Sequence, residues 1–365
     1  MKQTRLILVG GFLGAGKTTL LWETALRLME KGLRVGLVTN DQAPELVDSE
    51  LLKLSDLWVA EVSGSCFCCN FNGFTDAIKT IRAEVSADVI IAEPVGSCAD
   101  LSATIMQPLK QYWNAELRIS PLTVLADPNR LASILEEGNG GLHPDAAYIY
   151  KKQLEEGDII LLSKSDTLTA EGGASMRRRL SATFPSATVL SASAQTGEGL
   201  DEWIDAVLNR QDAGKRLLEI DYDTYAHGEA VLGWLNGTLL LHGVSESWDD
   251  FLKSLMVGLA AKFDEAGCAV GHVKVIAENG KRFAVGNLTG KQDTLSLRGS
   301  AGAGEDIKLI VNARVETTPE RLDEMVREVL LHTIGDSYKE EVVAWRFLQP
   351  GRPNPTHRFT EVVES

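Results

Sequence analysis

Short, nearly continuous apolar runs alternate with segments of helical periodicity over the first two-thirds of the chain. The runs that predict strands are RLILV, RVGLVTN, LWVAEVS, ADVIIAE, LTVLAD, GDIILLSKSD and ATVLSASA. Amphipathic spacing between them predicts helices, for example over residues 18–31 and 74–84. Apolar strands separated by helices are typical of a mostly parallel sheet that is covered on both faces. The pattern therefore predicts an α/β domain over residues 1–215.

The rhythm changes near residue 222. Strand patterns follow in EAVLGWLNGTLLLHG, AVGHVKVIAENG, KRFAVGNLTG, TLSLRG and DIKLIVNARVE, with helical patterns over residues 247–265 and 319–332. The turn ENGKRF between two strand patterns is a hairpin signal. We expect a smaller α+β domain over residues 222–340, with an antiparallel sheet backed by helices. Residues 341–365 are expected to form an extended tail, disordered or strand-like.

Composition narrows the classes of partner and compartment. A net charge of −15 over 365 residues argues against a nucleic-acid or anionic-membrane partner, since phosphates are bound by Lys and Arg clusters. No apolar run approaches the roughly 18 residues that a membrane span needs. The apolar start of the chain is better explained as a buried strand than as a signal peptide. Five cysteines, odd in number and clustered, favour a reducing, cytoplasmic setting.

A phosphate-binding motif follows the first predicted strand. GFLGAGKTT, residues 11–19, fits G-x-x-x-x-G-K-[ST] between a predicted strand and a predicted helix. Its glycines let backbone N–H groups face the phosphates, and the helix N-terminus adds a favourable dipole. We expect Lys17 to bridge the β- and γ-phosphates and Thr18 to ligate Mg²⁺. The predicted nucleotide-binding residues of this P-loop are Gly11, Gly14, Ala15, Gly16, Lys17, Thr18 and Thr19.

Carboxylates at other strand ends are candidates for catalysis. Glu93 ends the apolar strand of VIIAEPVG, and Gly96 follows it. A carboxylate there supports Mg²⁺, and the glycine N–H can sense the γ-phosphate. Asp41 and Asp48 lie where a nucleotide-responsive loop would fall. Either Asp can reach Mg²⁺ or the attacking water, or can simply be a solvated loop carboxylate.

Two partial motifs favour GTP over ATP. LLSKSD places Lys164 and Asp166 at a strand end, as in an N-K-x-D motif with Ser163 in place of Asn. The Asp of that motif accepts hydrogen bonds from guanine N1 and N2, which adenine does not offer. SASAQTGEGL then supplies Ser193 and Ala194, much like the S-A-K loop behind the guanine O6.

The stretch GSCFCCN concentrates Cys66, Cys68 and Cys69. Thiolates suit soft ions such as Zn²⁺ or Cu(I), and three ligands leave a tetrahedral ion one open position. Glu61, Asp41, water or a client protein are candidates for the fourth ligand. From the residues alone, small buried hydrophobes and a redox pair are equally open alternatives. Cys98 is a candidate for an extra ligand or for a core residue, and the core is favoured.

Together these motifs resemble the CobW-like GTPases, which are relatives of UreG and HypB. The resemblance rests on GGFLGAGKTTLL, on C-x-C-C at residues 66–69, on E-x-x-G at residues 93–96 and on the degenerate N-K-x-D. It covers about the first 215 residues. It implies GTP binding and hydrolysis coupled to the handling of zinc or cobalt and to delivery of the ion to a client protein. The His-rich stretch of many relatives is missing, since only six His are scattered along the chain.

The first hypothesis is a GTP-dependent metallochaperone with Lys17, Asp41 and Glu93 as its catalytic residues. We expect bound GTP and Mg²⁺ to order the loops around the cysteine segment, so that nucleotide and metal binding are coupled. No glutamine or arginine finger is evident, so a partner or a second copy of the chain is expected to complete a slow hydrolytic site. The alternatives are a GTPase chaperone for a corrinoid or other cofactor protein, and a P-loop kinase for a small molecule.

Overall fold

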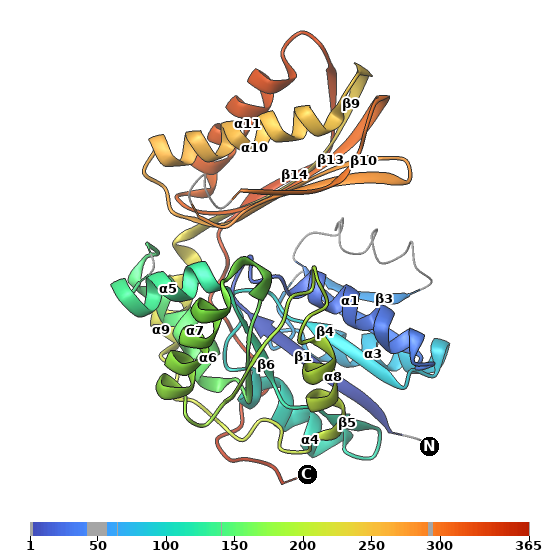
Figure 1. The fold of residues 1–365 in the computed structure, drawn as a ribbon, viewed down its shortest axis with the longest axis vertical. Helices are drawn as coiled ribbons and strands as arrows, with labels where there is room; N and C mark the ends of the chain where they lie inside the picture. Colours follow the sequence, from blue (N-terminus) through green and yellow to red (C-terminus); the bar gives the residue numbers. More distant parts are fainter. Residues whose placement is uncertain (1–2, 42–56, 64, 140, 291–294, 365) are drawn as a thin grey trace. The chain divides into compact units, whose positions relative to one another are not determined.

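The computed structural model describes residues 3–41, 57–63, 65–139, 141–290 and 295–364. Its contacts divide the chain into two compact units (Figure 1). The first unit comprises residues 1–140, 147–225 and 353–365. The second comprises residues 141–146 and 226–352. Both units therefore take in segments that are distant in the sequence.

The first unit is built on an eight-stranded sheet within the described residues, ordered β3-β2-β4-β1-β6-β7-β8 with β5 beside β1. Every pairing in it is parallel. This confirms the predicted parallel α/β class. The strands are β1 Thr4–Gly11, β2 Val35–Asp41, β3 Trp58–Ser63, β4 Val89–Glu93, β5 Leu117–Ile119, β6 Thr123–Ala126, β7 Ile159–Leu162 and β8 Thr188–Ser191.

Helices cover both faces of this sheet. Leu21 of α1 and Trp203 of α8 share a core with Leu37 of β2. The next position, Gly36, faces the opposite side, where Ile81 of α3 approaches so closely that a Cβ would lie 2.2 Å from its Cγ2. The helical segments are α1 Lys17–Glu30, α3 Phe71–Val85, a π-helical turn Ser102–Met106 that continues into α4 Gln107–Trp113, α5 Pro128–Glu137, α6 Pro144–Glu156, a 3-10 turn Ser165–Thr167, α7 Ala170–Thr183, α8 Leu200–Asn209 and α9 Tyr222–Ala230.

The second unit is a six-stranded sheet, ordered β12-β11-β10-β13-β9-β14 in the part of the chain described, and all its pairings are antiparallel. Two helices cover one face of it, as Figure 1 shows. This confirms the expected helix-backed α+β fold. Its elements are β9 Leu232–Ser245, α10 Trp248–Glu265, β10 Val270–Asn279, β11 Arg282–Leu288, β12 Ser296–Ser300, β13 Gly304–Glu316, α11 Pro319–Ile334 and β14 Lys339–Leu348.

The C-terminal residues, for which a disordered or strand-like tail is expected over residues 341–365, contain an edge strand and a segment that joins the first unit. β14 pairs with β9 as an edge strand of the second sheet. It packs Trp345 over Gly237, where a Cβ would lie 2.3 Å from the indole ring. Residues 353–364 belong to the first unit and contact it through hydrogen bonds and an ion pair. None of the described helices is long and apolar enough to cross a lipid bilayer.

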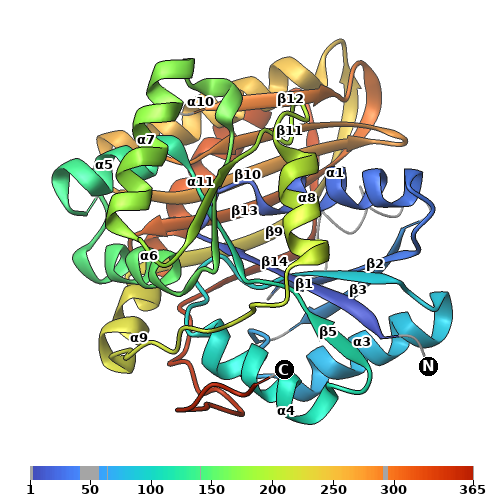
Figure 2. The ribbon, with the colours of Figure 1, turned by 60° about the horizontal axis from the view of Figure 1, so that its bottom comes forward.

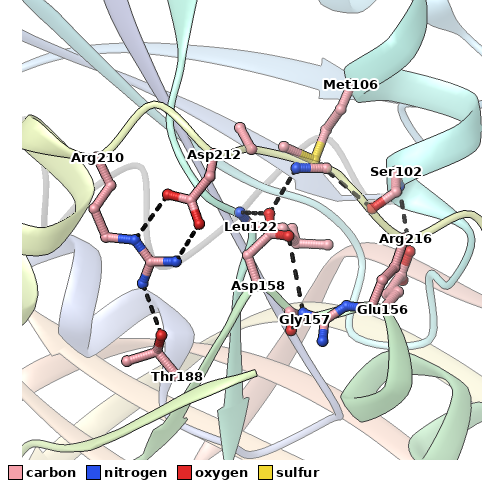
Figure 3. Close-up of polar contacts among 12 residues, drawn as sticks. Ser102, Met106, Leu122, Glu156, Gly157, Asp158, Thr188, Arg210, Asp212 and Arg216 are labelled. Carbon is pink, nitrogen blue, oxygen red and sulfur yellow. Dashed lines mark hydrogen bonds and ion pairs between the residues drawn. The ribbon is translucent and has the colours of Figure 1, made fainter. Parts of the chain in front are cut away.

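Buried carboxylates hold the segment after α8 against the sheet of the first unit (Figure 3). Asp158 accepts hydrogen bonds from the backbone N–H groups of Leu122 at 2.8 Å and Gly214 at 2.7 Å, and Arg216 lies 3.8 Å from its other oxygen. Burial raises the pKa of Asp158, and these partners oppose the rise. The chain that leaves the first unit is thereby fixed to β6 and β7.

The burial of the neighbouring Glu156 should make the free energy of unfolding depend on pH. Its Oε2 accepts from the Ser102 N–H at 3.2 Å, while burial, followed by the charge of Asp100, raises its pKa well above 4.5. The folded state then holds this proton more tightly than the unfolded state, so stability falls as pH rises above 4.5. We expect Glu156→Gln to make this decline shallower when thermal unfolding midpoints are measured from about pH 5 to pH 8. If the unfolding midpoints of the wild type and of Glu156→Gln changed equally with pH, this role of Glu156 would be contradicted.

Candidate functional site

The candidate site residues follow four neighbouring strands of the first sheet. Parallel strands end at the same edge, and ligands of open α/β sheets bind there. The order β3-β2-β4-β1 therefore aligns the cysteine loop after β3, Asn40 of β2, Glu93 of β4 and the P-loop after β1. In β2 and β4, Thr39 pairs with Glu93. The candidate nucleotide and metal sites are thus built on adjacent strands.

The P-loop turns tightly into α1. Gly16 starts the helix from a left-handed conformation with φ +93°, which disfavours any side chain there. The Lys17 ammonium donates to the carbonyl oxygens of Gly11 at 2.9 Å and Phe12 at 3.4 Å. It thereby curls back over the loop, where a bound phosphate would meet it. Binding of phosphate by this loop stays a prediction.

Glu93 lies beside the P-loop. Thr18 Oγ1 donates to Glu93 Oε1 at 3.3 Å, and Lys17 Nζ lies 3.9 Å from the same oxygen. Gly96 packs against this group so closely that a Cβ would lie 2.8 Å from Leu13 Cδ2 and 3.1 Å from Lys17 Nζ. A hydroxyl and a carboxylate side by side are the hard oxygen donors that Mg²⁺ accepts together with phosphate oxygens and water. The residues present therefore fit Mg²⁺.

Lys164 reaches across to the P-loop from the strand end after β7. It has a left-handed backbone with φ +51°, and its Nζ donates to the Gly14 carbonyl at 2.9 Å. The Ser193 hydroxyl donates to Asp166 Oδ1 at 2.6 Å. The structure thus brings Lys164 to the phosphate loop and Asp166 to Ser193, while guanine recognition by these residues stays a prediction.

Sequence reasoning missed Asp127. Its Oδ2 pairs with Lys164 Nζ at 2.7 Å, and its Oδ1 caps α5 by accepting from the N–H groups of Asn129 and Arg130. The available signal was LTVLAD, a strand that ends in Asp directly before Pro128, which is typical of a helix N-cap. Asp127 fixes the position of Lys164 over the P-loop.

The cysteine loop gathers three sulfur atoms. Its turn is closed by the Cys66 carbonyl, which accepts from the N–H groups of Cys69 at 3.0 Å and Asn70 at 2.9 Å. The Sγ atoms of Cys66 and Cys68 are 3.0 Å apart, and those of Cys68 and Cys69 are 3.9 Å apart. All three lie within 4.8 Å of one another, a grouping that fits a thiophilic metal ion.

Asn40 and Phe67 fix the cysteine loop to the sheet. The Asn40 amide donates to the carbonyls of Val62 at 2.7 Å and Ser65 at 2.9 Å, and its oxygen accepts from the Phe67 N–H at 2.9 Å. The buried Phe67 ring stacks on Phe74 of α3 with centroids 4.2 Å apart. The sulfurs are therefore carried on a loop whose backbone is held on both sides.

Cys98 lies near this cluster, outside the three sulfurs that are all within 4.8 Å of one another. It is 2% exposed, as a core residue would be, and its thiol influences the pKa of both Cys66 and Cys68. Hydrogen bonds from Cys68, Cys69 and Cys98 hold the pKa of Cys66 well below its ordinary value. Donation to Cys66 raises the pKa of Cys68, and burial adds to the rise.

Several predicted residues do not enter the described cluster. The Asp41 backbone ends β2, but its side chain and the whole of Asp48 lie outside the described residues. The described Glu61 carboxylate does not join the three sulfurs. Thr19 lies in α1, and Ala194 lies in the turn after β8, next to Ser193. A role for each of these residues stays a prediction.

The C-terminal residues lie against the cysteine loop within the first unit. The Asn354 N–H donates to Cys69 Sγ at 3.3 Å, and the Thr356 N–H donates to the Cys68 carbonyl at 2.8 Å. Arg358 Nε lies 2.7 Å from Oδ2 of Asp100, which is 1% exposed. In Figure 2 the same segment, drawn in red, runs beside α4. We call residues 353–364 the C-terminal strap.

Residues 5–191 match the sequence model of a protein family described as CobW/HypB/UreG, nucleotide-binding domain. Among characterised relatives, the chain is 28% identical over 179 residues to the zinc chaperone YeiR of Escherichia coli K12, covering 48% of this chain and 51% of that protein. It is 26% identical over 199 residues to a zinc chaperone CobW of a Sinorhizobium species, covering 47% and 54%. The chain thus spans about half the length of these relatives.

Solved structures give weaker likeness. Zn(II)-bound YjiA GTPase from E. coli is 13% identical with a TM-score of 0.36, covering 91% of this chain and 99% of that one. HypB from Helicobacter pylori in complex with nickel is 18% identical with a TM-score of 0.41, covering 57% and 87%. The family match therefore rests on the sequence model.

The contacts of the strap with Cys69 should slow the reaction of the Cys69 thiol with reagents in solution. Arg358→Ala removes a hydrogen bond between charged groups, typically worth about 1.5–3 kcal/mol, so the strap should open about tenfold more often. In metal-free protein, the Cys69 thiol should then react about tenfold faster with a disulfide reagent, as followed by absorbance and peptide mass mapping.

Two further variants control this measurement. Arg346→Ala, an exposed arginine of β14, should leave the rate unchanged. In a chain that ends at residue 352 the whole strap is missing. Its Cys69 should react at least as fast as in Arg358→Ala, even if the remaining strap contacts compensate for the point substitution. Equal Cys69 rates in the full-length and shortened chains would refute shielding by the strap.

Proposed function

This chain belongs to the CobW/HypB/UreG family of nucleotide-binding domains, and from that premise we propose that it is a GTP-hydrolysing metallochaperone. It takes up a thiophilic ion, zinc or cobalt, on Cys66, Cys68 and Cys69, and delivers that ion to a metal- or corrinoid-dependent client protein. Relatives named zinc chaperones in E. coli and Sinorhizobium support zinc as the cargo. Its free thiols suit the reducing cytoplasm.

The observation that carries this proposal is the short path between the two sites. Within six residues, Glu93 contacts Thr18 of the P-loop, Gly96 packs against Lys17, and Cys98 lies close enough to Cys66 to lower its pKa. A displacement of Gly96 by a γ-phosphate would therefore move a sulfur that lies beside the cysteine cluster. A backbone shift in residues 93–98 on nucleotide binding would therefore be transmitted to the bound metal ion.

At the nucleotide site, the chain supplies charge and orientation. Lys17 would neutralise the β- and γ-phosphates, while Thr18 and Glu93 would hold Mg²⁺, which neutralises charge that develops on the phosphate oxygens during hydrolysis. Water then displaces GDP from the γ-phosphoryl group, and the products are GDP and inorganic phosphate. Lys164, Asp166 and Ser193 would select guanine. Hydrolysis is slow until a client or a second copy of the chain completes the site.

At the cargo site, the chain offers three sulfurs in one turn and a fourth, Cys98, behind them. An ion bound by Cys66, Cys68 and Cys69 keeps one tetrahedral position open for Cys98 or for a ligand of the client. A ligand of the client could replace Cys98 in the fourth position. The ion would then begin its transfer while the three cysteines still hold it. This arrangement supports delivery of the ion over permanent structural retention.

The two sites should be separable by substitution. Replacing Cys66, Cys68 and Cys69 by Ser should remove one tight Zn²⁺ site from the stoichiometry measured by calorimetry, and leave Mg²⁺-dependent GTP turnover within about twofold. Lys17→Ala should lower GTP turnover by roughly 10²–10³-fold and keep the Zn²⁺ stoichiometry. Cys268→Ser, a partly buried cysteine of the second unit, is the matched control and should change neither. Undiminished Zn²⁺ stoichiometry in the triple variant would refute the cargo site, and a phosphorylated small molecule in place of free phosphate would refute hydrolysis.

A further inference from the structure

A second group of side chains with the chemistry of metal ligands lies in the second unit, away from the cysteines in the sequence. Asp145, at the start of α6, and His227 of α9 are 82 positions apart, and His227 Nδ1 lies 2.5 Å from Asp145 Oδ2. His143 Nδ1 lies 3.8 Å from the same carboxylate oxygen. The two imidazoles meet edge to face, with centroids 5.1 Å apart at 74°. One carboxylate oxygen therefore faces two imidazoles.

A plain surface ion pair does not explain this group. One carboxylate and one protonated imidazole make such a pair, and exposed pairs contribute little to stability. A second protonated imidazole would be repelled by the first, and one proton cannot serve both rings. A divalent cation accepts lone pairs from both imidazoles and from the carboxylate at once. Two His and one Asp are a donor set typical of Zn²⁺, Co²⁺ and Ni²⁺.

The distances need little adjustment for an ion. With Zn–N and Zn–O bonds of about 2.0–2.1 Å, tetrahedral ligand atoms lie roughly 3.3 Å apart. The separations of 2.5 and 3.8 Å lie on either side of this value, and the ligand atoms of all three residues are within 4.8 Å of one another. A shift of less than about one ångström in each ring suffices, since two ring torsions allow it.

The backbone around His143 is already held in place. Glu316 Oε2, at the end of β13, accepts from the His143 N–H at 3.0 Å. The Asp145 N–H donates to His143 Nδ1 at 3.2 Å and orients the ring of His143; an ion bound at Nδ1 would replace this hydrogen bond. His227 is exposed, while His143 and Asp145 are half-buried. An ion can therefore enter from solvent onto a group that is partly preorganised.

We propose that His143, Asp145 and His227 form a second divalent-metal site, specific for borderline ions such as Zn²⁺, Co²⁺ or Ni²⁺. It binds more weakly than the thiolate cluster because it offers nitrogen and oxygen donors with a single negative charge. Solvent supplies its remaining ligands. This inference does not depend on the proposed metallochaperone function.

The test uses the full chain in which Cys66, Cys68, Cys69 and Cys98 are all Ser, titrated with Co²⁺ and with Zn²⁺. We expect one remaining Zn²⁺ site by calorimetry and, with Co²⁺, ligand-field bands without sulfur-to-cobalt charge transfer. His143→Ala and His227→Ala should each weaken this binding at least tenfold. His242→Ala is the matched control, because this exposed imidazole of the second unit faces the carboxylates of Asp306 and Glu341 without a second imidazole.

The outcomes separate this site from the cysteine site. Loss of binding in both His143→Ala and His227→Ala, but not in His242→Ala, supports the second site whatever the cysteines do. No binding in the cysteine-free chain, or equal weakening by all three His substitutions, overturns it. Thermal unfolding of each variant shows that a lost signal comes from the ligand and not from the fold. Failure of the wild-type cysteines to bind Zn²⁺ would instead sink the proposed function and leave this inference standing.

Discussion

The close packing of Gly96 against the P-loop is the constraint on which the proposed coupling of the two sites depends. A side chain at this position would force its neighbours to shift, because a Cβ would lie 2.8 Å from Leu13 Cδ2 and 3.1 Å from both the Leu13 backbone nitrogen and Lys17 Nζ. The backbone after β4 is therefore held directly against the group that would bind phosphate. Cys98, only two residues further, lies beside the cysteine cluster and influences the pKa of Cys66. The proposed nucleotide site and the proposed cargo site thus share one short stretch of backbone.

The parallel sheet brings these segments together because its strands end at the same edge. The four strands β3, β2, β4 and β1 are adjacent, and each delivers one part of the site at the same edge. Asn40 links the cysteine loop to β2, and the register of Thr39 with Glu93 links β2 to β4. Couplings between ligand sites are typically 1–3 kcal/mol, which is comparable to one or two hydrogen bonds of the kind that hold these segments. The loss or gain of a single hydrogen bond along this edge could therefore account for a coupling free energy of this size.

Sequence reasoning found what local patterns encode. Buried strands, the helices α1, α3, α10 and α11 and the P-loop follow from periodicity and from a short motif with its expected context. It misplaced residues 229–230 in a strand, whereas they end α9, because a mixed polar and apolar stretch fits either element. A strand-like tail was one of two alternatives for the residues of β14, but its pairing with β9 was not predicted from the pattern.

What the sequence could not reveal are the contacts between distant residues. Arg358 pairs with Asp100 across 258 positions, and His227 meets Asp145 across 82. Cys98 was expected in the core, and its burial agrees, yet its place beside Cys66 is set by the neighbouring strands β4 and β2. Burial patterns predict that a side chain is inside, but they do not say which side chains it faces there.

Coupling of nucleotide state to metal binding through residues 93–98 can be measured in solution. Zn²⁺ affinity of the full chain is measured by competition with a chromophoric chelator, in the presence of GDP and of a non-hydrolysable GTP analogue. We expect affinities that differ at least about fivefold between the two states. The coupling also predicts that Cys98→Ser reduces this difference while GTP binding is retained. Equal Zn²⁺ affinities in the two nucleotide states would contradict it.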